Sequence, residues 1–184
     1  MFKSKLDAGD RIRTDTIVIK IDEEKLKANP PKTATVPMPI PAHLRKAADN
    51  ELEDMLDAKF VEPVKGETDS SSRGFFREKQ TSKDETRKVR LVSDFKEINR
   101  VIQRPNYPFE GSSQILKRLE PDQVVFACLD MSSGYHQCEL AEESRDLFTI
   151  ILPQGKYRFC VLPQVVSAEC NGDRMRTKID PTEE

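Results

Sequence analysis

The strongest periodic pattern of apolar positions in the chain lies between residues 44 and 60. Apolar side chains recur there at spacings of three and four residues, and charged side chains fill most of the positions between them. The apolar set is Leu44, Ala48, Leu52, Met55, Leu56 and Phe60. We therefore predict an amphipathic helix over residues 43–60, which ends before Pro63 because proline cannot continue a helix.

A second pattern, alternation with a period of two, predicts a half-buried strand over residues 89–95. One face of this segment carries Val89, Leu91 and Ser93, and the other carries Arg90, Val92 and Asp94. The segment before it is polar and basic. We predict that residues 68–74 form a loop, because they are rich in serine and charged side chains.

Four further segments have the composition of strands. Residues 12–21 are rich in β-branched side chains and predict an edge strand, and residues 124–129 form an apolar run that predicts a buried strand. Residues 148–152 and 157–162 flank Pro153 to Lys156, a four-residue loop that suits a β-hairpin. Mixed helix and strand patterns of this kind predict an α+β fold.

Composition limits the size of the core. The chain has 184 residues, of which 36% are apolar and 34% are charged, so we expect one small core with extended segments around it. Five of the twelve prolines fall within residues 30–41, which denies that segment regular hydrogen bonding and predicts an extended linker.

Charge is distributed unevenly along the chain. The net charge is −2, which excludes a uniformly basic nucleic-acid-binding protein. Residues 73–104, however, carry ten Lys or Arg and five Asp or Glu, a local charge of +5. Such a segment either is a solvated surface or meets phosphate groups, and charge alone leaves both interpretations open.

The cysteine and histidine positions match no metal-binding or redox motif. The four cysteines are separated by 10, 22 and 10 residues, so we expect buried free thiols rather than a zinc site, and the two histidines, His43 and His136, read as surface or hydrogen-bonded polar residues. The sequence has no signal-peptide pattern and no apolar run of membrane-spanning length. We expect a soluble, intracellular protein without a membrane partner.

An acidic residue, Asp130, follows the apolar run 124–129 directly. A carboxylate at the mouth of a core loses hydration unless a cation or hydrogen bonds compensate. Asp130 therefore either caps the turn formed by Ser132 and Ser133, or binds a metal ion.

Three motifs around these positions identify a family resemblance. They are VRLVSDFKEINRVIQRPNYPF from residue 89, FACLDMSSGYHQCELAEES from residue 126 and LPQGKYRFCVLPQ from residue 152. In order and spacing they resemble the fingers and early palm of reverse transcriptases, particularly those of Ty3/gypsy-type retrotransposons. The resemblance implies a right-hand polymerase fold divided into an N-terminal extended, weakly structured arm (1–36), a fingers-like region (37–123) and an incomplete palm (124–184).

The resemblance also implies a role for individual residues. Asp130 matches the first catalytic aspartate, which with the backbone carbonyl of Met131 binds Mg²⁺ during two-metal transfer of a dNTP to a primer 3′-hydroxyl. Arg90 matches an arginine that contacts the nucleotide triphosphate. A companion lysine is implied at Lys83 by the retroviral spacing, or at Lys79 by the shorter gypsy loop, and we favour Lys83.

Two further positions match the nucleotide pocket of the family. Tyr135 matches the aromatic residue under the nucleotide sugar, and Gln164 a residue that approaches that sugar. From the sequence alone Tyr135 is equally a core aromatic, and Gln164 equally a polar residue at the end of a strand. The Asp94 and Lys96 positions match residues that anchor the fingers strand.

The chain also departs from the family. After Gln164 it has Val165 and Val166 where the family has glycine, and it contains no pair of adjacent aspartates, the second metal-binding signature. We therefore expect the isolated chain to be inactive without the rest of the palm, the thumb and RNase H, although its family implies template–primer and dNTP as partners. The alternatives are a non-catalytic, salt-dependent nucleic-acid-binding remnant, or a host-adopted interaction module that docks through the helix at 43–60.

Overall fold

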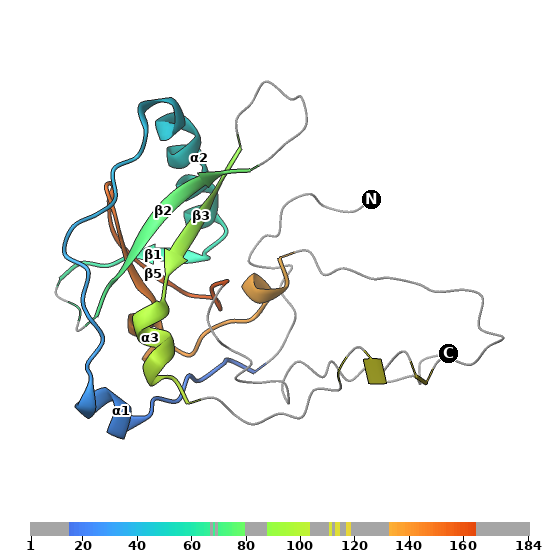
Figure 1. Cartoon of the computed structure of the whole chain (residues 1–184). Coiled ribbons are helices and arrows are strands. Elements are labelled where there is room, and N and C mark those ends of the chain that lie inside the picture. The colour runs from blue at the N-terminus through green and yellow to red at the C-terminus, as the bar shows by residue number, and fades with distance from the viewer. Residues whose placement is uncertain are drawn as a thin grey trace.

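The protein folds into one curved sheet with helices on its face and at its ends (Figure 1). The structure is a computed structural model and describes residues 15–66, 68, 70–79, 88–103, 111, 113–114, 117–118 and 133–164. The helices are α1 (Glu23–Ala28), α2 (Arg45–Asp57), α3 (Lys96–Val101) and α5 (Glu142–Arg145), with 3-10 turns η2 (Ala42–Leu44), η3 (Gly134–Gln137) and η4 (Asp146–Phe148). The strands are β1 (Val61–Pro63), β2 (Ser72–Glu78), β3 (Val89–Asp94), β4 (Thr149–Leu152) and β5 (Gly155–Phe159).

The sheet has the order β1-β5-β4-β2-β3. All neighbouring strands are antiparallel except β2 and β4, which run parallel through the pairs Ser72 with Ile150 and Arg73 with Ile151. The α+β class predicted from the sequence is therefore confirmed. Among the described helices, none is long and apolar enough to span a membrane.

The helix predicted over residues 43–60 is confirmed with slightly different ends. It starts as the 3-10 turn η2, continues as α2 and stops at Asp57, after which Lys59 adopts a left-handed φ of 54°. Its apolar face, which includes Leu52 and Met55, is buried in the core against β3 and β1. Because this face is already packed inside the molecule, the docking-module alternative has no support.

The hydrophobic core is built around aromatic contacts between distant segments. Phe95 lies at the end of β3 and meets Phe148 edge-on at 5.3 Å and Phe159 at 5.9 Å between ring centroids. All three side chains are at least 97% buried. Edge-to-face contacts of this kind join the end of β3 to the β4–β5 hairpin and the turn before it.

The strands differ from the predictions in two places, and one predicted strand is not tested. The loop predicted over residues 68–74 is wrong in its second half, because Ser72 already begins β2. The predicted hairpin is confirmed, but its turn is tighter: Leu152 pairs with Gly155, and only Pro153 and Gln154 lie between them. The predicted strand at 124–129 lies outside the described residues.

The predicted edge strand over residues 12–21 forms isolated bridges rather than a strand, as far as it is described. Ile17 bridges to Leu140, and Ile21 bridges to Ile102 at the end of α3. The segment crosses between two distant parts of the chain, so no neighbour follows it for long enough to form a ladder. It is nevertheless anchored, because Ile17 and Ile19 are buried and the Ile19 N–H donates to Ser144 Oγ at 2.9 Å.

An ion cluster ties the hairpin to the segment before it. Arg158 of β5 donates to Glu62 of β1, to Asp146 at 2.7 Å and to Glu142 at 2.8 Å. Arg145 adds an ion pair to Glu142 at 3.0 Å. Asp146, and after it Glu62, raise the pKa of Arg158 well above its usual value. The cluster therefore connects β1, β5, α5 and η4 by charge.

Cys138 and Cys160 are buried free thiols, as expected from the spacing of the cysteines. Burial raises the pKa of Cys138, and it raises that of Cys160 to about 11 with a smaller contribution from Glu62. Both thiols are therefore protonated and unreactive at neutral pH.

Candidate functional site

The hairpin formed by β2 and β3 has one buried and one exposed face. Phe76 and Val89 point into the core, whereas Arg73, Arg77 and Arg90 are exposed. The strand register pairs Arg77 directly with Arg90 and Arg73 with Asp94. Directly paired residues in an antiparallel ladder share a face and lie about 5 Å apart at Cβ, so Arg77 and Arg90 project from the same face of the ladder as neighbours.

The Arg77–Arg90 pair has no compensating carboxylate in the part of the chain that the structure describes. Among the described residues, the only contact of either guanidinium is that of Arg77, which lies 5.5 Å from the centroid of the Phe75 ring. Glu78 is the next residue along β2 and pairs with Val89, on the alternate face of the ladder. The nearest acid on the same face of the register is Asp94, and its Oδ1 accepts the N–H of Lys96 at 3.2 Å. Like charges placed opposite each other destabilise a strand pair by roughly 0.2–1 kcal/mol, which a bound anion would reverse.

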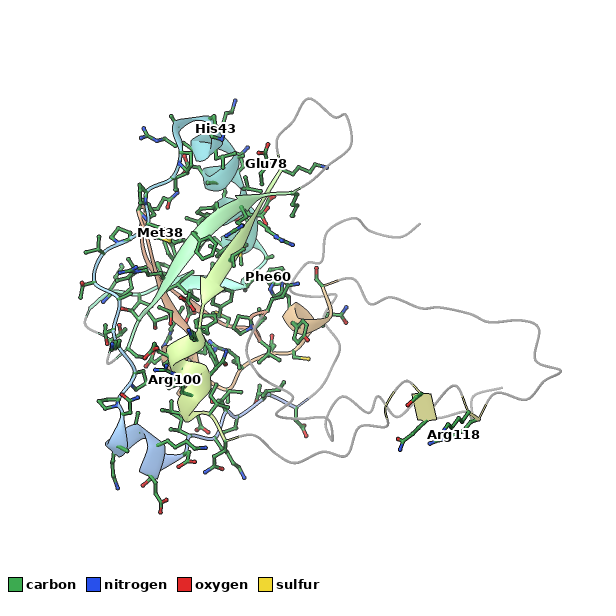
Figure 2. The ribbon with its side chains drawn as sticks, in the orientation of Figure 1. Met38, His43, Phe60, Glu78, Arg100 and Arg118 are labelled. Carbon is green, nitrogen blue, oxygen red and sulfur yellow. The ribbon has the colours of Figure 1, made fainter. Side chains whose placement is uncertain are left out.

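The same ladder continues toward the tip of the hairpin with two lysines. The Lys79 N–H donates to the Lys88 carbonyl at 2.8 Å. These two lysines lie opposite each other, two positions along the ladder from the Arg77–Arg90 pair. Lys79 Nζ lies 3.8 Å from Glu51 Oε1, which ties this end of β2 to α2. Figure 2 shows Glu78 at this end of the strand, close to the helix. Lys83, the favoured companion lysine, lies outside the described residues.

Two other predicted site residues lie on segments that are joined by a backbone hydrogen bond. Tyr135 belongs to η3 and is 45% exposed, which excludes the core-aromatic alternative. Gln164 is exposed and follows Leu162, whose N–H donates to the Cys138 carbonyl at 2.9 Å. Cys138 comes three residues after Tyr135 and Leu162 two residues before Gln164, so this hydrogen bond joins the two segments near both residues.

The helical turn that carries Tyr135 is held by its neighbours. Ser133 enters it with a left-handed φ of 50°, and the His136 ring lies 4.9 Å from the ring of Phe60 between centroids. Figure 2 places Phe60 beside this turn. The prediction that His43 and His136 are surface or hydrogen-bonded polar residues is confirmed, because His43 is exposed on η2 and His136 is partly exposed on η3.

The structure leaves the rest of the predicted site untested. Asp130 and Met131 lie outside the described residues, and the described residues contain no hydrogen bond or ion pair between Arg90 and either Tyr135 or Gln164. Within the same residues, no group of three His, Cys, Asp or Glu side chains could hold a metal ion. The position missed by sequence reasoning is Arg77, because only the strand register reveals its pairing with Arg90.

Comparison with known proteins agrees with the resemblance in the motifs. No family model matches the chain. The retrovirus-related Pol polyprotein from transposon 412 of Drosophila melanogaster is 33% identical over 113 residues, which cover 61% of this chain, and that from transposon gypsy is 40% identical over 74 residues, which cover 40%. The chain's homologues are retrovirus-related Pol polyproteins of gypsy-type transposons. The enzymatic polyprotein of cauliflower mosaic virus (strain Strasbourg) is also 27% identical over 119 residues, 65% of this chain.

The chain spans only a small part of the length of these three polyproteins. It covers 9% of the transposon 412 polyprotein, 7% of the gypsy polyprotein and 17% of the viral one. The solved protease–reverse transcriptase of prototype foamy virus matches 76% of this chain and 18% of its own length, with a TM-score of 0.59 and 19% identity. A foamy viral protease–reverse transcriptase in complex with double-stranded DNA matches 73% of this chain and 22% of its own length, with a TM-score of 0.55 and 17% identity. The fold is therefore that of retroviral reverse transcriptases.

Proposed function

We propose that this chain forms the fingers and the beginning of the palm of an RNA-directed DNA polymerase. The observation that carries the proposal is the exposed face of β2 and β3, where Arg90 lies opposite Arg77 and neither forms an ion pair within the described residues, in a chain similar to Pol polyproteins. Phosphoryl transfer depends on positioning and on electrostatic stabilisation of phosphate oxygens, and guanidinium groups provide both. In this proposal, residues 37–123 are the fingers, residues 124–184 begin the palm, and residues 1–36 lead into them.

Arg90 would hold the triphosphate of the incoming dNTP, with Lys83 or Lys79 as a second cation. The exposure of Arg90 and the absence of an ion pair to it among the described residues support this role. Tyr135 and Gln164 would contact the nucleotide sugar, and their placement on adjacent segments with exposed side chains is compatible with a shared pocket. A bulky ring below the sugar would reject a 2′-hydroxyl by steric clash.

Asp130 would provide the carboxylate of the metal site, together with the Met131 carbonyl. Its chemistry fits, because Mg²⁺ prefers hard oxygen ligands. When bound, Mg²⁺ would neutralise charge on the phosphate oxygens and on the primer 3′-oxygen. Since the sequence contains no adjacent pair of aspartates, we propose that the isolated chain does not polymerise and that the other carboxylates come from a further part of the polymerase.

Template–primer and dNTP are the proposed partners. The foamy viral relative solved with double-stranded DNA supports a nucleic-acid partner for this fold. The excess of positive charge in residues 73–104 would contribute through the phosphate backbone, and such binding weakens as salt is raised.

Primer extension tests the proposal in a hybrid protein. Residues 37–164 of this chain replace the corresponding segment of the transposon 412 polyprotein, and incorporation of dTTP on a poly(rA)–oligo(dT) template–primer is measured with Mg²⁺. The hybrid should extend the primer, and Asp130→Asn should reduce extension by at least about 1000-fold while template–primer binding stays unchanged. Asp57→Asn, the same change at the exposed end of α2, is the control and should remain active.

Two results would contradict the proposal. One is undiminished extension by the Asp130→Asn hybrid. The other is a hybrid that binds template–primer with the affinity of the transposon 412 protein but does not extend it.

A further inference from the structure

Arg77 has no role in the site described so far, although its surroundings are those of a ligand-binding residue. It is exposed on β2, and the register pairs it directly with Arg90. Its guanidinium lies over the ring of Phe75, 5.5 Å from the centroid. This contact holds the side chain along the strand and leaves the N–H groups at its edge free for an anion.

The other cross-strand pair on this face has a different electrostatic character. Arg73 faces Asp94, an acid, whereas Arg77 faces a second guanidinium. The Arg77 and Arg90 side chains make no ion pair in the described part of the chain. Two adjacent guanidinium groups without a carboxylate repel each other, and an anion with several oxygens that bridges them removes the repulsion.

We propose that Arg77 and Arg90 together form a two-arginine clamp for a chain of phosphates, with Arg77 as a phosphate-binding residue of equal importance. The inference deepens the proposed function and rests on it for the role of Arg90. The phosphates belong either to the triphosphate of a nucleotide or to the backbone of a nucleic-acid strand. In both cases the chemistry is bidentate donation from guanidinium N–H groups to phosphate oxygens.

Binding to the 184-residue chain tests the clamp. A fluorescein-labelled 12-nucleotide DNA strand is titrated with protein at several KCl concentrations, and fluorescence anisotropy gives Kd. Arg77→Gln and Arg90→Gln should each weaken binding about tenfold at low salt. Each should also make the salt dependence weaker, so that the negative slope of log association constant against log salt concentration decreases in magnitude by about 0.7. Arg73→Gln is the matched control, because it removes the same charge from the same face, and it should weaken binding less than threefold.

Competition by unlabelled compounds distinguishes the two sources of phosphate. If the clamp binds a nucleotide, inorganic tripolyphosphate and dTTP displace the strand from the wild-type chain, and both are weaker competitors against Arg77→Gln. If the clamp binds the strand backbone, neither compound competes, yet strand affinity still depends on Arg77.

Thermal unfolding without any anion separates a binding role from a structural one. Arg77→Gln relieves repulsion across the strand pair, so its Tm should equal or exceed that of the wild-type chain. A lower Tm together with the loss of binding would mean that Arg77 supports the fold, and would overturn the inference.

The remaining outcomes separate this inference from the proposed function. If Arg77→Gln binds the strand with unchanged affinity while Arg90→Gln binds it more weakly, the clamp is refuted and the proposed role of Arg90 is left intact. Wild-type binding by both variants would refute both. Equal losses in Arg73→Gln and Arg77→Gln would reduce the effect to the total charge of the face and would also refute the clamp.

Discussion

The ion cluster around Arg158 should contribute measurably to stability, and Arg158→Gln tests how much. The arginine is 23% exposed and Glu62 is 35% exposed, so this pair is partly shielded from solvent. We assign it about 1–2 kcal/mol. Glu142 and Asp146 are 70% and 66% exposed, and each of these pairs is worth about 0.2–1 kcal/mol.

The free energy of unfolding should therefore fall by about 2–3 kcal/mol in Arg158→Gln. Arg145 limits the loss, because it remains 3.0 Å from Glu142 and 3.9 Å from Glu62 and still neutralises part of the acidic charge. With a urea m-value of about 2 kcal/mol/M, the unfolding midpoint should drop by about 1 M. Circular dichroism at 222 nm in a urea titration measures this shift.

Salt separates the two parts of the effect. In 1 M NaCl the Debye length is about 3 Å, so the exposed pairs are screened and the difference between Arg158→Gln and wild type should shrink to about half. Arg45→Gln removes an exposed arginine from the start of α2 and should shift the midpoint by less than about 0.3 M. A loss below about 0.5 kcal/mol at low salt, or a loss unaffected by salt, would refute the assignment.

Three other substitutions or conditions test the packing. Gly74→Ala should cost about 1–2 kcal/mol in urea unfolding, because a Cβ there would lie 2.6 Å from Leu152 Cδ2 in the core; an unchanged midpoint would contradict this packing. Leu52→Asp should abolish the helical circular dichroism signal, since Leu52 is 5% exposed, whereas a folded variant would revive the docking-helix alternative. Raising the pH from about 9 to about 11 should lower the free energy of unfolding, because burial raises the pKa of Cys160 to about 11 and the thiol can lose its proton more easily in the unfolded chain. Cys160→Ala should flatten that pH dependence.

Sequence reasoning succeeded where one face of an element packs on the core. The helix at 43–60 and the strand at 89–95 were predictable because burial imposes a period of 3.6 or of 2 on apolar positions. The sequence of β2, by contrast, contains a glycine and two adjacent phenylalanines, which hide its alternation. Glycine suits position 74 because a Cβ there would meet the Leu152 side chain. This is a tertiary contact, so the local sequence pattern cannot reveal it.

The candidate site was only partly readable for a similar reason. A motif marks Arg90, because its spacing to Asp94 is local in the sequence. Arg77 is recognised only through its partner across the hairpin, and the register that pairs them depends on residues at both ends of a long connection. The N-terminal segment likewise gave no local signal that Ile17 and Ile19 would be buried against residues more than a hundred positions away.

The most direct test of the account is the effect of Arg90→Gln on nucleotide use by the polymerase hybrid described above. Steady-state primer extension gives KM for dTTP and kcat, and a separate titration gives the affinity for template–primer. If Arg90 holds the triphosphate, kcat/KM for dTTP should fall at least about tenfold while template–primer affinity stays within about twofold of the parent hybrid. An unchanged kcat/KM would contradict the claim that the exposed β2–β3 face binds the incoming nucleotide.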